Sequence, residues 1–219
     1  MKFNEVTNSI FRVCEIISKM VYVNLLWILF TVLGLGILGF MPATVALFTV
    51  TRKWVMGDKD IPVFKTFWST YRKEFFKSTL LGVILFVIGY IIYIDLVLLP
   101  TGGIINLLRL GIFICGVLFA IVLLYIFPVY VHYDWNKRLY MKYALLVGAS
   151  HPHYTLLMVA GIVGLYYITI TIPGIIPFFS VSVLAYILMW PSYQIIKKME
   201  AVQAAEQKRV EAGQILESK

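Results

Sequence analysis

The chain has 219 residues, of which 61% are hydrophobic and only 14% are charged. Soluble globular domains carry about 25% charged residues, so this composition excludes an ordinary water-soluble domain and predicts a membrane protein. The formal net charge of +8 would also suit a nucleic-acid-binding protein. The basic residues, however, lie between long apolar runs and form no single stripe, which argues against nucleic acid as a partner.

Five apolar segments have the length of membrane-spanning helices, since about 20 residues at about 1.5 Å each cover the hydrocarbon core. They are residues 20–38, 79–99, 107–131, 154–172 and 175–196. No small-residue cleavage site follows the first run, so we expect a retained span and not a signal peptide. The sequence predicts an all-α, polytopic membrane helix bundle. Residues 1–196 would form one transmembrane domain and residues 197–219 a cytoplasmic helical tail.

The first apolar run is interrupted by Gly34, Gly36 and Gly39, followed by Pro42, which could open a second helix. Residues 42–50 are too few to cross a bilayer but enough to return part of the way. We therefore expect a re-entrant or short sixth helix, buried in protein, with both termini cytoplasmic. The alternative is one long tilted helix. It would place three basic N-terminal residues outside, against the positive-inside rule.

Residues 62–78 form an amphipathic pattern in the basic connection after this run. Aromatic residues repeat at helical spacing on one face, and basic residues occupy much of the rest. Such a helix is expected in the interface plane, with its cations against an anionic inner leaflet. The functional interpretation is a docking helix for a cytoplasmic partner, and the alternative is a simple interfacial anchor. The residues concerned are Phe64, Phe67, Trp68, Tyr71, Arg72, Lys73 and Phe75.

The connections between spans divide into two kinds. Residues 100–106 and 172–174 are short, uncharged and rich in turn formers, so each should join an antiparallel hairpin on the outer side. The connections at 52–77 and 134–142 and the tail from 197 carry most of the Lys and Arg residues. The positive-inside rule places them in the cytoplasm.

Asp95 is the one acidic residue within a span, and Arg109 is the one basic residue near the outer side. They lie on either side of a short connection, so they should reach similar depth. We expect a structural ion pair that fixes this hairpin. The alternative is a transport or proton-relay role for Asp95.

Three histidines, His132, His151 and His153, fall near the inner surface by this topology. The proline between the last two is expected to hold the backbone extended and to separate their side chains, which is poor geometry for a shared metal. No zinc-protease helix, nucleophile elbow or P-loop is visible. We therefore predict no metal site, no cofactor and no catalytic residue.

Several glycines are spaced for close helix contact, namely Gly82, Gly89, Gly161 and Gly164. This contact could lie within the bundle or between subunits. A homo-oligomer is therefore one of the assemblies that the sequence allows.

The segments NLLWILF, GFMPATVALFTVTRKWVMGD and VFKTFWSTYRKEFFKSTLLGVI follow one another in an order that resembles the YesL family of small bacterial membrane proteins, a family of unknown function. The resemblance covers most of the chain and is strongest over residues 24–84. It implies an inner-membrane protein of Gram-positive bacteria, in a family often encoded beside ABC-type carbohydrate importers and polysaccharide-degrading enzymes.

The resulting hypothesis is a non-enzymatic accessory component of carbohydrate uptake in the cell membrane. Its partner would be an ABC importer permease or ATPase, contacted through residues 63–78 and the basic connection at 134–142. One alternative is an autonomous small-solute transporter with its site at the broken first span and Asp95. Another is a membrane organiser or sensor that acts by oligomerisation.

Overall fold

The computed structural model describes residues 2–58, 60–100, 102, 105–133, 144–148 and 150–217, and within them the chain is all-helical. The helices are α1 (Lys2–Leu33), α2 (Ile37–Met56), α3 (Val63–Leu98), α4 (Ile105–His132), α6 (Pro152–Thr171), the 3₁₀ helix η1 (Pro173–Ile175) and α7 (Ile176–Glu217). Five stretches are long and apolar enough to cross a membrane: Val13–Leu33, Val63–Leu98, Ile105–His132, Pro152–Thr171 and Pro173–Val202. The predicted fold class is confirmed.

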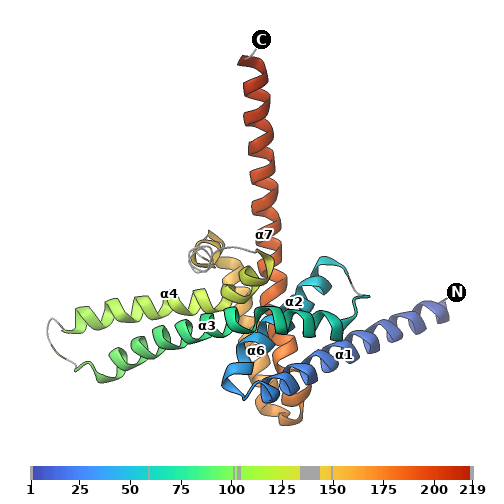
Figure 1. Cartoon of the computed structure of the whole chain (residues 1–219), viewed down its shortest axis with the longest axis horizontal. Coiled ribbons are helices and arrows are strands. Elements are labelled where there is room, and N and C mark those ends of the chain that lie inside the picture. Colours follow the sequence, from blue (N-terminus) through green and yellow to red (C-terminus); the bar gives the residue numbers. More distant parts are fainter. Residues whose placement is uncertain are drawn as a thin grey trace.

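Figure 1 shows how these helices are arranged. α3 and α4 run side by side as a long hairpin, whose far half projects from the body as an arm. α2 lies at the centre, against α1, α3, α4 and α7. α7 runs in a different direction, and its C-terminal half extends away from the other helices.

The first apolar run breaks into two helices, α1 and α2, as predicted. The chain turns at Leu35 and Gly36, which have φ values of 61° and 70°. A Cβ atom on Gly39 would lie 2.6 Å from the carbonyl oxygen of Thr31, so the two helices approach too closely for any side chain there. Leu35 is not a glycine, and its left-handed conformation marks a strained turn.

α2 begins earlier than predicted, at Ile37 and not at Pro42, because the glycine turn already ends α1 before this point. Pro42 lacks the N–H that would pair with the carbonyl of Leu38. The hydroxyl of Thr79 on α3 lies 3.2 Å from that carbonyl, although its single proton is shared with the carbonyl of Phe75 at 2.6 Å. α2 is largely buried, which agrees with the expectation that backbone returning into the membrane is enclosed by protein.

The amphipathic helix predicted at residues 62–78 does not end before the next predicted span, but continues into it without a break. Val63–Leu98 is one continuous helix, about 54 Å long at 1.5 Å per residue. Its aromatic face packs on the protein: Phe67 is fully buried, and its ring centroid lies 5.3 Å from that of Phe30 on α1. The hydroxyl of Tyr71 donates to the carbonyl oxygen of Phe30 at 3.0 Å. The aromatic period therefore records contact with α1 and α2, although Phe64 and Trp68 stay partly exposed.

A buried amide connects α1 to α7. Asn24 is 1% exposed and donates through Nδ2 to the carbonyl oxygen of Pro177 at 2.7 Å. Its Oδ1 accepts from the backbone N–H groups of Val181 and Ser182 at 3.2 and 3.1 Å. Pro177 and Val181 are four residues apart, so the amide contacts two groups that an uninterrupted helix would pair with each other. The first turns of α7 are thus fixed to α1.

The glycines identified from the sequence mostly serve packing within the chain. A Cβ on Gly82 would collide with Met41, one on Gly89 would lie 3.2 Å from Phe119, and one on Gly161 would lie 2.7 Å from Ile187. Only Gly164 of the four has open space around it. Three of these positions are therefore occupied by close contacts inside the chain.

Candidate functional site

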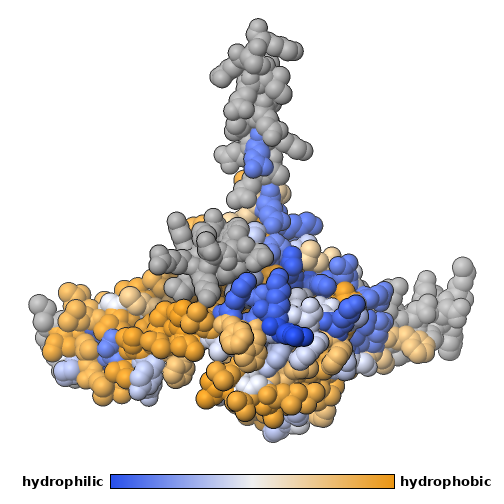
Figure 2. Space-filling view, viewed as in Figure 1, coloured by the Kyte–Doolittle hydropathy of each residue, from blue (hydrophilic) through white to orange (hydrophobic). Residues whose placement is uncertain are grey.

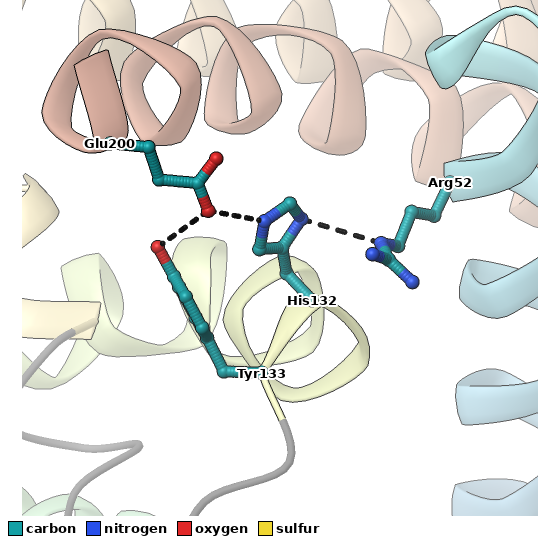
Figure 3. Close-up of polar contacts among 4 residues, drawn as sticks. All are labelled: Arg52, His132, Tyr133 and Glu200. Carbon is teal, nitrogen blue, oxygen red and sulfur yellow. Dashed lines mark hydrogen bonds and ion pairs between the residues drawn. The ribbon is translucent and has the colours of Figure 1, made fainter. Parts of the chain in front are cut away.

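Three helices meet in a polar cluster, at the ends of α2 and α4 and at the point where α7 leaves the body (Figure 3). Arg52 Nε donates to His132 Nδ1 at 3.3 Å. His132 Nε2 lies 3.1 Å from Glu200 Oε1, and the Tyr133 hydroxyl donates to the same oxygen at 3.3 Å. We call these four residues the polar clasp.

The donors of the clasp determine its protonation. An Arg Nε can only donate, so His132 accepts at Nδ1 and holds its proton on Nε2, from which it donates to the Glu200 carboxylate. The imidazole is therefore neutral between a cation and an anion. Its side chain is 8% exposed and that of Glu200 is 50% exposed. Partial burial lowers the pKa of Arg52, an effect that Glu200 opposes, and the guanidinium stays charged.

Further polar contacts lie around the clasp. The Tyr130 hydroxyl donates to Glu74 Oε2 at 2.7 Å, which joins α4 to α3. Lys198 donates to the Tyr154 hydroxyl at 3.3 Å, which joins α7 to α6. Hydrophilic surface is accordingly concentrated around the base of the projecting part of α7, while the arm of α3 and α4 is apolar (Figure 2).

Two sets of polar contacts show which helix ends lie together. Lys19, near the start of the first candidate span, lies 3.8 Å from Asp60 in the connection after α2. The clasp brings the end of α2 beside the end of α4 and the start of the α7 tail. The polar start of the first span and the connection after α2 therefore share one side, as a two-helix first unit requires. The alternative of one long tilted helix does not hold.

The clasp places a neutral histidine between a basic and an acidic side chain, with a tyrosine hydroxyl on the acidic one. Within the described residues, no three or more His, Cys, Asp and Glu side chains gather so that they could hold a metal ion. The proline between His151 and His153 does not separate their rings as expected, because it opens α6, and the centroids lie 5.8 Å apart. The arrangement is suited to holding three helix ends together.

The remaining predicted site residues stand apart from the clasp. Asp95 and Arg109 lie on the neighbouring helices α3 and α4, and both are half-buried. The ion pairs of the described residues, defined by a distance of up to 4.0 Å, do not include Asp95 and Arg109. The predicted pair therefore stays a prediction. Arg72 and Lys73 are exposed on α3. The basic connection at 134–142 lies outside the described residues.

Sequence reasoning missed the clasp because its members are far apart in the chain: 80 residues separate Arg52 from His132, and 68 separate His132 from Glu200. A usable signal was present. Each residue is among the first polar positions after a long apolar stretch, and all three stretches were predicted to end on the same side of the membrane.

The five candidate spans and the polar end define a class, the multi-span helical membrane proteins. Residues 20–96 match the family described as "Protein of unknown function, DUF624". The chain is 50% identical to the uncharacterized protein YteU of Bacillus subtilis over 190 residues, 86% of each chain. It is 36% identical to the uncharacterized protein YesV of the same organism over 200 residues, 90% of this chain and 95% of YesV.

The uncharacterized protein YesL of Bacillus subtilis is 34% identical over 206 residues, which cover 94% of this chain and 98% of YesL. The chain belongs to the DUF624 family, and the resemblance to YesL is confirmed. No solved structure matches the chain.

Proposed function

We propose that the chain is a non-enzymatic accessory membrane component of carbohydrate uptake, which binds an ABC-type importer through the end that carries the polar clasp. Carbohydrate uptake rests on the genomic association that the family resemblance implies. The observation that carries the binding role is the second half of α7, which projects from the body while its base is held at Glu200. A projecting helix fixed at its base is suited to contact another subunit.

The proposal moves the contact surface from the one that the sequence suggested. Phe67 and Tyr71 are buried against Phe30 within the chain, so they are not free to bind a partner. The projecting part of α7 takes their place. We further propose that the end with the clasp faces the cytoplasm, because Lys19, Arg52 and the basic start of the tail gather there and the positive-inside rule favours this orientation.

An autonomous transporter that uses both the broken first span and Asp95 has less support. Thr79 contacts Leu38 beside the break, and Asp95 lies sixteen residues further along α3. At 1.5 Å per residue this separation is about 24 Å, too far for the two to line one solute site.

The test is affinity purification from the native membrane in mild detergent, followed by identification of proteins that co-purify in fixed stoichiometry. The full chain is compared with a variant that lacks residues 204–219. We expect an importer permease or ATPase with the full chain and its loss with the shortened one. The proposal fails if the full chain is recovered alone, or if the shortened chain retains the same partner. Unchanged thermal unfolding of the shortened chain controls for folding.

A further inference from the structure

A pocket of about 340 Å³ opens beside the turn between α1 and α2. Its walls are largely aromatic: the rings of Trp68 and Tyr71 stack at 6.2 Å, and Tyr71 meets Phe75 edge to face at 5.6 Å. The α1–α2 unit supplies the rest of the lining, namely Phe30, Leu33, Gly34, Leu35 and Leu38. The volume lies within the roughly 300–1,000 Å³ of small-molecule sites.

The pocket is suited to an apolar chain and not to a polar solute. A polar ligand needs several converging hydrogen-bonding groups. The Tyr71 hydroxyl proton is already donated to the Phe30 carbonyl. Leu33 and Leu35, which line the pocket, are 65% and 81% exposed, and Leu33 ends a candidate span. Such exposed apolar residues beside a membrane-spanning segment imply hydrocarbon surroundings. The ligand that can reach the pocket from hydrocarbon surroundings is the acyl chain of a lipid.

Two cations flank the same side of α3. Arg72 lies four residues after Trp68 and three before Phe75, and Lys65 lies three residues before Trp68, so these positions share a helical face. Both cations are exposed, and no ion pair to either exists among the described residues. We propose that the pocket binds one anionic phospholipid, with an acyl chain against Trp68 and Tyr71 and its phosphate headgroup at Lys65 and Arg72.

α3 also supplies a matched control. Lys73 and Lys77 are exposed on the same helix, but each is displaced from Arg72 by more than a quarter turn, away from the pocket. Replacing them changes the charge of α3 by the same amount without touching the proposed headgroup site. If the attraction to anionic lipid were only electrostatic, replacing either pair of cations would weaken lipid binding equally.

The experiment is native mass spectrometry of the full chain released from vesicles that contain equal amounts of phosphatidylglycerol and phosphatidylcholine. We expect one phosphatidylglycerol per chain under conditions that remove phosphatidylcholine. The Lys65→Gln plus Arg72→Gln variant should retain at least about fivefold less, since one cation at the bilayer surface has about this effect. The Lys73→Gln plus Lys77→Gln variant should retain as much as the original chain. Leu38→Trp, which fills the pocket, should abolish retention with all charges present.

Equal loss in the two charge variants, equal retention of both lipids, or full retention by Leu38→Trp would each overturn the proposal. A second measurement needs no variant and therefore does not depend on whether the variants fold. A phosphatidylglycerol analogue with a photoreactive acyl tail is cross-linked to the unaltered chain. Cross-links should concentrate at Leu35 and Leu38. If they are as frequent at Phe86, which is 72% exposed on the arm, the lipid is a general boundary lipid and the site does not exist.

Discussion

Replacing Gly39 with alanine tests the paired α1–α2 unit most directly. The new Cβ would lie 2.6 Å from the carbonyl oxygen of Thr31 and 2.8 Å from that of Phe30, both of them backbone atoms that no side-chain rotation can move. Overpacking of this kind costs about 1–3 kcal/mol, against a gain of up to about 1 kcal/mol in helix propensity. We expect Gly39→Ala to lower the free energy of unfolding by about 1–2 kcal/mol.

Gly164→Ala is the matched control. Gly164 also lies within a helix, but an added Cβ would meet nothing within 4 Å, so only the propensity gain of up to about 1 kcal/mol remains. The two variants should therefore change stability in opposite directions. The assay is unfolding in mixed micelles by titration with a denaturing detergent, followed by tryptophan fluorescence. Equal stabilisation by both variants would refute the close approach of α1 and α2 and would favour one long helix.

Three further predictions use the same unfolding assay. Asn24→Ala removes three hydrogen bonds to α7 and should lower the free energy of unfolding by about 1–3 kcal/mol. The control is Ser192→Ala, which removes a hydroxyl that donates within α7 and should cost under about 0.5 kcal/mol. Similar losses in the two variants would contradict the role of the amide. Phe67→Ala should cost about 3–5 kcal/mol because the ring is fully buried, and a loss below about 1 kcal/mol would mean that it faces lipid. Asp95→Asn should change stability by less than about 0.5 kcal/mol and show little coupling to Arg109→Gln, since the ion pairs of the described residues do not include these two; a larger coupling would establish the predicted pair.

Much of the fold follows from the sequence because the bilayer restricts it. Apolar length predicts the spans, and the short uncharged connections predict the hairpins. The glycines before Pro42 predicted the break, because α-helical backbone rarely tolerates so many interruptions without turning. The start of α2 was misplaced, since the strained turn at Leu35 and Gly36 carries no proline and has no sequence rule of its own.

The polar clasp could not be derived in the same way. Hydrogen bonds between Arg52, His132 and Glu200 depend on how three helix ends are placed relative to one another, and helical periodicity describes each helix alone. The sequence predicted that all three residues lie on one side of the membrane. It could not predict that they lie within hydrogen-bonding distance, because tertiary packing sets that distance.

The amphipathic half of α3 shows why an aromatic period in a membrane protein has two meanings. Lipid and protein interior are both apolar, so the rings of a helix suit either one, and only the neighbouring residue decides between them. Here Phe30 decides, because its ring packs on Phe67 and its carbonyl accepts from Tyr71. The cations of α3 follow a different rule, since a charged group requires a polar or anionic neighbour whether the rings face lipid or protein. Burying the rings therefore leaves Lys65 and Arg72 free to bind lipid headgroups, now beside a defined pocket and not along a flat interface.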